Sequence, residues 1–145
     1  MAIDLGNVQV IDLSENSHTI LGIAINTSPK TGGAFQPNYT TLQQAKSNLV
    51  NLILTKKGER VAQPDFGCDI WRILFEPIIN GEIDARVEST ILDAVSTWLP
   101  YISIDEILLD YSPELIDSYG FNVEIRFSLA SNPNLNESVT INVNP

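Results

Sequence analysis

A change of hydrophobic period along the chain constrains the fold most strongly. Residues 121–129 alternate strictly between large apolar and polar side chains, and residues 139–143 alternate in the same way. A period of two is typical of a strand with one buried face and one face in water. Residues 102–109 form a third apolar series with an irregularity near its middle, and the turn-forming residues 132–134 separate the last two strands. The C-terminal third therefore predicts an antiparallel β-meander.

Between residues 40 and 57 the hydrophobic period is that of a helix. The apolar side chains that fall on one helical face are Leu42, Ala45, Leu49, Leu52 and Ile53. Thr40 or Thr41 can accept a hydrogen bond from the amides of the first turn, so the helix is expected to begin there. Gly58 can adopt the left-handed conformation that ends a helix.

A second long helix is predicted from about Ile83 to Trp98, because its apolar residues share one face and Pro100 stops it. A short helix is predicted over residues 68–75. Since helices come first and strands follow, the expected fold class is α+β, with two long helices and a short helix packed on a small antiparallel β-meander. This domain is expected to comprise residues 40–145.

Residues 1–39 differ from the rest of the chain in their sequence pattern and are predicted to form an extended N-terminal arm. They hold two β-like runs, residues 8–13 and 20–25, followed by a long loop that contains Pro29, Gly32, Gly33 and Pro37. Long loops without secondary structure are uncommon inside a small domain. Two interpretations stay open: an arm that lies on another molecule, or a terminal strand of the same sheet.

The charge balance argues against two classes of partner. Eight Lys and Arg residues stand against 18 Asp and Glu, which gives a net charge of -10. Binding to nucleic acid depends on clustered cations that neutralise phosphates, and an anionic membrane surface repels an acidic chain. The longest apolar runs, such as residues 20–25, are far shorter than the ~20 residues that span a bilayer. We expect a soluble chain made in a cytoplasm, with no nucleic acid or membrane as partner.

Cysteine and histidine are too few for a metal or disulfide framework. Cys68 has no second cysteine to pair with, and His18 leaves no Cys/His set for zinc. Acidic neighbours are expected to raise the pKa of Cys68, which predicts a small core residue rather than a reactive thiolate. No phosphate loop surrounds Gly32 and Gly33, and no nucleophile elbow surrounds a serine. We expect no cofactor.

Carboxylates are the one plentiful type of catalytic side chain. Glu59, Asp65, Asp69 and Glu76 cluster after the first helix, and a pair of carboxyl groups could in principle cleave a glycosidic bond. Arg60 and Arg72 lie among them and favour the charged state, which is the wrong direction for a general acid. The cluster is therefore interpreted as structural ion pairs, with no catalytic residue.

Two further features point to assembly. A second acidic run contains Asp105, Glu106, Asp110, Glu114 and Asp117 and could dock on a basic partner, although plain solubility explains it as well. The last strand, residues 139–143, holds no Lys or Pro to guard its edge. An unguarded edge is either covered by the chain's own arm or offered to another chain for strand addition.

Three linked motifs resemble the signature of a known family. They are Thr55-Lys56-Lys57-Gly58-Glu59-Arg60, Pro64-Asp65-Phe66-Gly67 and Leu74-Phe75-Glu76-Pro77. In this order they resemble the sheath-initiating baseplate wedge proteins of contractile-tailed bacteriophages. That family is built around phage baseplate protein W and the wedge protein of gene 25, and has relatives in type VI secretion baseplates. The resemblance covers about residues 42–143, including a C-terminal hairpin similar to residues 123–133.

One departure from the family concerns the end of the second long helix. Family members often carry a Glu-Pro-Arg triplet there, whereas this chain reads Leu99-Pro100-Tyr101. The proline is kept and both charges are gone. Contacts that the triplet makes with neighbouring wedge components are therefore expected to be lost or to have become apolar.

The resemblance implies a structural role at the top of a phage tail baseplate, in six copies around the tail tube. The implied partners are the tail sheath protein, the baseplate wedge proteins and the tail tube, within a virion assembled in the host cytoplasm. Strands of the first sheath ring are expected to add to the small sheet and so template the sheath. The residues assigned to this interface are Val139, Ile141 and Val143, supported by Val123, Ile125 and Phe127.

Two alternatives stay open beside this role. The first is a baseplate component of a bacterial contractile injection system, either type VI secretion or a tailocin. The second is a peptidoglycan-cleaving lysozyme, because some family members carry that label. Glu59, Asp65 and Glu76 would then be its carboxylates, although the expected role of all three is structural.

Overall fold

The computed structural model describes residues 20–25, 35–73, 82–110 and 120–143. The chain divides into two units, residues 1–44 and residues 45–145. The predicted strand over residues 8–13 and three of the predicted loop residues, Pro29, Gly32 and Gly33, lie outside the described residues.

The first unit contains a short antiparallel hairpin. Strand β1 (Gly22–Ile25) pairs with β2 (Phe35–Asn38) from Gly22↔Asn38 to Ile25↔Phe35. Pro37, predicted to lie in a loop, is instead a strand residue opposite Ile23. In a two-stranded sheet each strand has an unpaired side, and proline is tolerated on such an edge because it lacks only an N–H. β1 and β2 form a sheet of their own, so residues 22–25 are not a terminal strand of the C-terminal sheet.

Helix α1 (Thr41–Leu54) begins as predicted. The Thr40 hydroxyl accepts a hydrogen bond from the Gln43 amide at 3.2 Å, which satisfies one of the orphan donors of the first turn. Its buried residues are Ala45, Leu49, Leu52 and Ile53, as the helical period predicts. The predicted closure at Gly58 is wrong, because the helix ends at Leu54 and Gly58 takes its positive φ of 89° in the loop beyond.

Two more helices follow. The short helix α2 (Ile70–Ile73) lies within the predicted range, and Leu74 and Phe75 fall outside the described residues. Helix α3 (Glu82–Trp98) matches the predicted second long helix and buries Val87, Ile91, Ala94 and Val95. The last-turn bond from the Leu99 amide to the Val95 carbonyl, at 2.8 Å, comes just before Pro100.

The three C-terminal strands form the predicted meander, in the order β3–β4–β5. β3 (Ile102–Asp110) pairs antiparallel with β4 (Phe121–Leu129), and a bulge at Asp105 confirms the predicted irregularity. β5 (Asn132–Val143) returns along the other side of β4. The turn falls on Ala130 and Ser131 rather than on residues 132–134.

The residues predicted as a turn instead enter β5 and disturb its register. Leu129 pairs with Asn132, but Ser128 pairs with Asn136, so residues 133–135 are extra residues on the β5 side. Pro133 has no N–H for a ladder, which suits a position in such a bulge. The alternation that predicts the strand resumes at Glu137, and Val139, Ile141 and Val143 are buried as expected.

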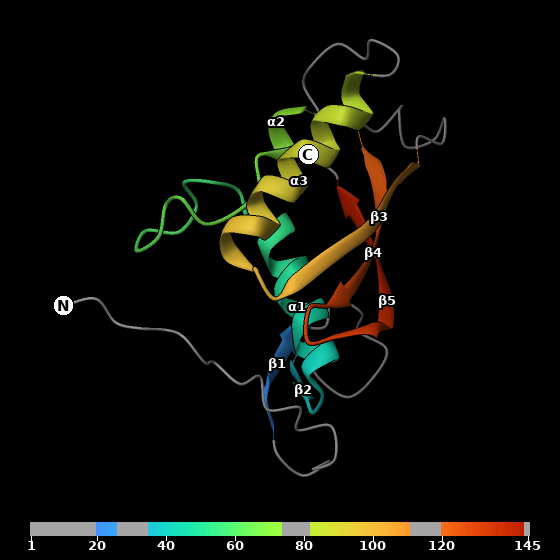
Figure 1. Cartoon of the computed structure of the whole chain (residues 1–145). Helices are drawn as coiled ribbons and strands as arrows, with labels where there is room; N and C mark the ends of the chain where they lie inside the picture. The colour runs from blue at the N-terminus through green and yellow to red at the C-terminus, as the bar shows by residue number, and fades with distance from the viewer. Residues whose placement is uncertain (1–19, 26–34, 74–81, 111–119, 144–145) are drawn as a thin grey trace, which may run out of the picture. The chain divides into compact units, whose positions relative to one another are not determined.

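The core of the second unit lies between the sheet and the helices. Figure 1 shows α2 and α3 on one side of the β3–β4–β5 sheet. The central strand β4 turns Val123, Ile125 and Phe127 completely away from solvent, and Leu49, Leu52 and Ile91 are equally buried. The predicted α+β fold, with helices packed on an antiparallel meander, is confirmed.

Candidate functional site

The family motifs around Thr55 to Gly67 form one closed loop between α1 and α2, which we call the signature loop (residues 55–67; Figure 1, green). The Cys68 amide donates to the Thr55 carbonyl at 2.9 Å and so closes its base. Inside the loop the Gly58 amide donates to the Pro64 carbonyl at 2.7 Å. These two hydrogen bonds hold residues from the two ends of the loop against each other, and so they fix a single backbone path for residues 55–67.

Two glycines make that path possible. Gly58 has φ 89° and Gly67 has φ 126°, values that L side chains rarely adopt. The surroundings of the two differ. A Cβ atom at Gly67 would lie 2.4 Å from the Thr55 carbonyl oxygen, the same oxygen that accepts the Cys68 amide, whereas a Cβ at Gly58 would meet open space.

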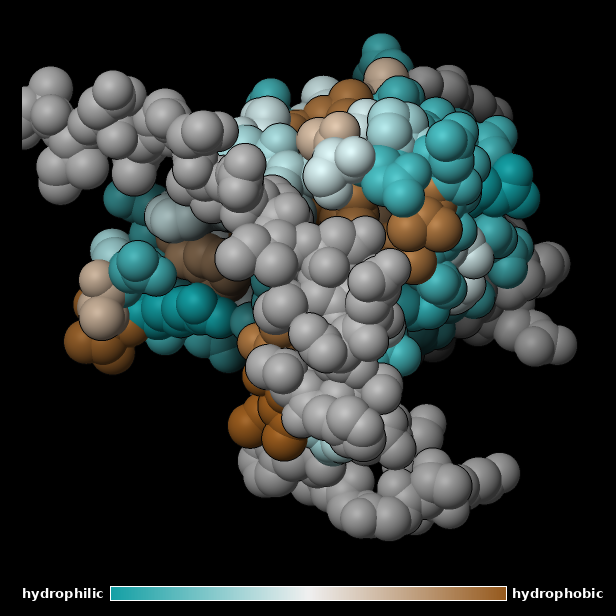
Figure 2. Space-filling view, turned by 60° about the horizontal axis from the view of Figure 1, so that its bottom comes forward, coloured by the Kyte–Doolittle hydropathy of each residue, from teal (hydrophilic) through white to brown (hydrophobic). Residues whose placement is uncertain are grey.

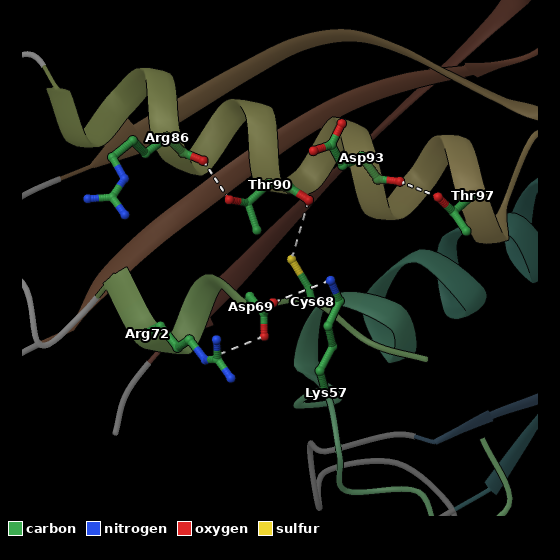
Figure 3. A network of polar contacts seen from close by, with 8 residues as sticks. All are labelled: Lys57, Cys68, Asp69, Arg72, Arg86, Thr90, Asp93 and Thr97. Carbon is green, nitrogen blue, oxygen red and sulfur yellow. Dashed lines mark hydrogen bonds and ion pairs between the residues drawn. The ribbon is translucent and has the colours of Figure 1, made fainter. Parts of the chain in front are cut away.

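The acidic residues of the loop hold local structure. The Glu59 carboxylate accepts the Lys56 amide at 3.1 Å, and the Glu59 amide donates to the Lys56 carbonyl at 3.1 Å. Asp69 lies 3.3 Å from the Lys57 ammonium and 3.8 Å from the Arg72 guanidinium (Figure 3). The ion-pair interpretation therefore fits Asp69. Glu59 instead caps a turn, Asp65 is exposed, and Glu76 lies outside the described residues with Phe75 and Pro77.

Aromatic rings lie beside two of the cations. The Arg60 guanidinium lies 3.7 Å from the centre of the Phe66 ring, which is a cation–π contact. Glu76, one of the carboxylates expected to pair with Arg60, lies outside the described residues. Phe66 in turn meets Trp98 edge-on, with ring centres 5.2 Å apart. The Lys56 ammonium lies 4.3 Å from the centre of the Trp71 ring. Sequence reasoning placed Trp98 on an apolar helix face but missed that it anchors this loop.

The altered triplet ties three elements together. Leu99 is buried, Pro100 is exposed, and the Tyr101 hydroxyl accepts a hydrogen bond from the Asn48 amide group of α1 at 2.8 Å. The Tyr101 carbonyl accepts the Ala130 amide at 3.0 Å. Where the family often has two charges, this chain thus has one core residue and one neutral hydrogen bond. The Asn48–Tyr101 bond was missed because no local pattern relates two residues so far apart.

The edge of β5 is the second candidate site. No strand among the described residues pairs with its outer side. Its side chains alternate, with Val139, Ile141 and Val143 buried and the residues between them exposed. Val123, Ile125 and Phe127 lie on β4, which is paired on both sides, so they support the edge from beneath and cannot receive a strand themselves.

One hydrogen bond fixes which backbone groups of β5 face outward. The Ala130 amide donates to Tyr101, in register with the pair Ile102↔Leu129. Because amides alternate in direction along a strand, the even-numbered residues of β4 point toward β3 and the odd-numbered ones toward β5. The odd-numbered β5 residues pair with the latter. We infer that Ser138, Thr140 and Asn142 direct their N–H and C=O groups away from β4, and we call these groups the free edge.

The acidic run is partly neutralised. Arg126 lies opposite Glu106 in the sheet and pairs with it at 2.7 Å, and also with Glu124 at 3.6 Å. Lys46 pairs with Glu137 at 3.0 Å. An open hollow of about 630 Å³ here is lined by Asp105, Glu106, Arg126, Asn136, Glu137 and Ser138. Glu114 and Asp117 lie outside the described residues.

Cys68 is a core residue. It is fully buried, and its sulfur lies 3.9 Å from the Thr90 carbonyl of α3 (Figure 3). Burial is the main cause that raises the pKa of the Cys68 thiol, whereas the expected cause, the negative charge of Asp69, is a smaller one. In the part of the chain that the structure describes, no group of three or more His, Cys, Asp or Glu residues could hold a metal ion. No helix there is long and apolar enough to cross a membrane.

The two glycines of the signature loop give a first prediction. Gly67→Ala is expected to lower the free energy of unfolding by about 2 kcal/mol or more, because a left-handed backbone is strained and the new Cβ meets a fixed carbonyl oxygen. Gly58→Ala is the matched control and is expected to cost only the backbone strain, about 1–2 kcal/mol. Urea denaturation of both variants measures the difference. Equal losses would show that the Thr55 carbonyl does not constrain residue 67.

The raised pKa of Cys68 gives a second prediction. The stability that the protonated thiol contributes is fully present below the thiol pKa of the unfolded chain, about 8.5. It is lost as the pH rises through the higher pKa of the folded state. The melting temperature of the wild type should therefore fall more between pH 8 and 10 than that of Cys68→Ala. Parallel curves would contradict this account of the buried thiol.

Comparison with known proteins identifies the family of this chain. Residues 40–134 match the family described as baseplate wedge protein gp25. The chain is 36% identical over 103 residues to the baseplate wedge protein gp25 of Enterobacteria phage T4, an alignment that covers 69% of this chain and 73% of that protein.

Solved structures share the fold. A candidate tail lysozyme of Geobacter sulfurreducens superposes with a TM-score of 0.61 at 22% identity, over 72% of this chain and 91% of that one. A chain of the baseplate complex from the type VI secretion system superposes with a TM-score of 0.53 at 15% identity, over 71% and 92%. At these identities the likeness concerns the fold alone. The match over residues 40–134 and the 36% identity show that this chain belongs to the family of gp25 baseplate wedge proteins.

Proposed function

We propose that this chain joins a baseplate wedge to the first ring of a tail sheath and templates that sheath by strand addition. As a member of the baseplate wedge family it is a baseplate component, and the proposal assigns its two sides. The helical half, with the signature loop, docks on wedge proteins. The strand half receives the sheath protein in the virion's tail baseplate.

The free edge is the observation that carries this proposal. Ser138, Thr140 and Asn142 have exposed side chains, and residues 136–143 hold neither Lys nor Pro. Natural sheets usually protect such an edge with lysine, proline or a covering segment. An unprotected edge with a fully packed face beneath it suits the pairing of an incoming strand.

The energetics of strand addition require more than the edge itself. The four even-numbered residues of 136–143, Asn136 and the three of the free edge, offer four donors and four acceptors, and each hydrogen bond contributes only about 0.5–1.5 kcal/mol net. An isolated pairing is therefore weak. We propose that six copies around the tail tube engage one sheath ring together, because multivalency multiplies a modest affinity.

The same physics suits a bacterial contractile injection system, either type VI secretion or a tailocin. The free edge, the signature loop and the fold would serve a sheath there in the same way. The proposal places the chain in a phage tail, assembled in the host cytoplasm. Packaged DNA in purified particles that contain the chain would support the phage assignment, and a particle without a genome would support the alternative.

Thr140→Pro tests the free edge. The substitution removes one outward N–H, whereas the ladder to β4 is kept because the Thr140 amide points away from it. We expect the free energy of unfolding to stay within about 1 kcal/mol of the wild type, since proline is tolerated on an edge. Sheath stubs formed with cognate sheath and baseplate proteins, counted by negative-stain microscopy, should become at least tenfold rarer.

Thr140→Val is the matched control, because it removes the hydroxyl and keeps the backbone N–H. It should form stubs at the wild-type yield. Ile141→Pro is expected to unfold the sheet, since that amide points to β4 and the side chain is buried. Normal stub formation by Thr140→Pro would rule out strand addition at this edge.

A lysozyme activity is tested on the same samples. In the signature loop Glu59 accepts a backbone hydrogen bond, and a glutamine oxygen can accept the same bond. We expect no release of peptidoglycan fragments by the wild type or by Glu59→Gln. Release by the wild type that disappears in Glu59→Gln would overturn the structural role and make Glu59 a catalytic carboxylate.

A further inference from the structure

The tip of the signature loop exposes its apolar residue completely. Val61 is 101% exposed, and residues 62–65 beside it are exposed as well. In Figure 1 this green loop projects away from α2 and α3. A single exposed valine is ordinary on a protein surface. What sets this one apart is the loop that carries it.

The loop is held in one shape by contacts at its base and flank. Thr55 and Cys68 close the base, Gly58 and Pro64 bond across the middle, and Phe66 packs on Trp98 of α3. A preformed segment loses little conformational entropy on binding. The tip is therefore built as a rigid projection, which is the form that a docking element needs.

Two cations of the signature loop are oriented by aromatic rings: Arg60 directly precedes Val61, and Lys56 directly follows the base residue Thr55. Arg60 lies on Phe66 and Lys56 lies on Trp71, and neither forms an ion pair with any residue that the structure describes. Lys57 and Arg72, by contrast, share Asp69. Stacked cations keep their N–H groups available for a carboxylate. A partner that approaches the tip thus meets one apolar side chain, Val61, next to one cation, Arg60, that is stacked on an aromatic ring.

The hollow beside Arg126 is a poor match for this tip. It carries carboxylates, but all of its lining residues are polar, so it offers no apolar side chain to a valine. On the face shown in Figure 2, brown hydrophobic side chains form small separate groups among teal ones. This hollow and this face of a second copy therefore fit the tip poorly.

We propose that the signature loop is the element by which the helical half docks on its wedge protein: Val61 enters an apolar pocket whose rim carries Asp or Glu side chains that face Arg60. This inference rests on the proposed docking of the helical half on wedge proteins. It names the docking element and the chemistry of the receptor. The acidic rim gives orientation, and the buried valine gives affinity.

Val61→Glu tests whether the signature loop is the docking element. The measurement is the affinity of the full chain for the cognate wedge complex that has been purified without this chain. We expect the dissociation constant to rise about tenfold or more, because the apolar contact is lost and a carboxylate faces the acidic rim. Leu92→Glu is the matched control: Leu92 lies on α3 of the same half, is 40% exposed, and stands outside the loop. It should bind within about twofold of the wild type.

Arg60→Gln removes the positive charge of this side chain and keeps most of its length, so it tests how far charge contributes to binding. It should weaken binding at low salt and flatten the rise of the dissociation constant with salt concentration, because screening acts on the charges at the rim. An unchanged salt dependence would overturn the acidic rim. Melting temperatures verify that every variant is folded.

The outcomes distinguish this inference from the proposed function. If Val61→Glu binds with wild-type affinity, or if Val61→Glu and Leu92→Glu lose affinity equally, the signature loop is not the docking element. The proposed docking of the helical half would still stand. A wild type that binds no wedge complex would overturn both. If light scattering shows a dimer that Val61→Glu dissociates, the receptor is a second copy and the wedge assignment is wrong.

Discussion

The hydrogen bond from the Cys68 amide to the Thr55 carbonyl, at 2.9 Å, sets the geometry on which much of the second unit depends. It joins the end of α1 to the start of α2, and Gly67 between them has no room for a side chain. With that base closed, Phe66 reaches Trp98 and Asp69 reaches Lys57 and Arg72. The two family motifs within residues 55–67 therefore describe one loop, in which the base hydrogen bond, the two glycines and the contact of Phe66 with Trp98 belong to the same backbone path.

In strand β5 of the same unit, the side chains and the backbone polar groups are used differently. β5 has its apolar side chains fully used in the core, while half of its backbone polar groups face outward. The core packing and the inferred free edge thus use different atoms of the same strand. A substitution at Ile141 changes a buried side chain, and a substitution at Thr140 changes an exposed one. The outward backbone groups can therefore be altered without changing the packing of the core.

Local patterns in the sequence predicted the elements well, because periodicity and capping are local properties. The cap of α1 at Thr40, the buried face of α3 and the alternation of β4 all agree with the structure. Side-chain partners were beyond those patterns: Arg60 stacks on Phe66, and Tyr101 bonds to Asn48. The turn at Ala130 and Ser131 was misplaced because Asn132-Pro133-Asn134 carries turn-type residues that a bulge uses equally well. For the candidate site, the sequence named Val139, Ile141 and Val143, whose side chains the structure buries, whereas the backbone groups inferred to face outward belong to the residues between them.

The bulge of β5 has a consequence for the length of any strand added there. Residues 133–135 leave the regular ladder, and Pro133 lacks an N–H, so regular pairing can begin only at Asn136 and end at Val143. Eight residues at about 3.4 Å each give a track of roughly 27 Å. In the proposed strand addition, the bulge would end this track on one side and so fix where the added strand ends. The bulge would thereby set the register of the added sheath strand on β5.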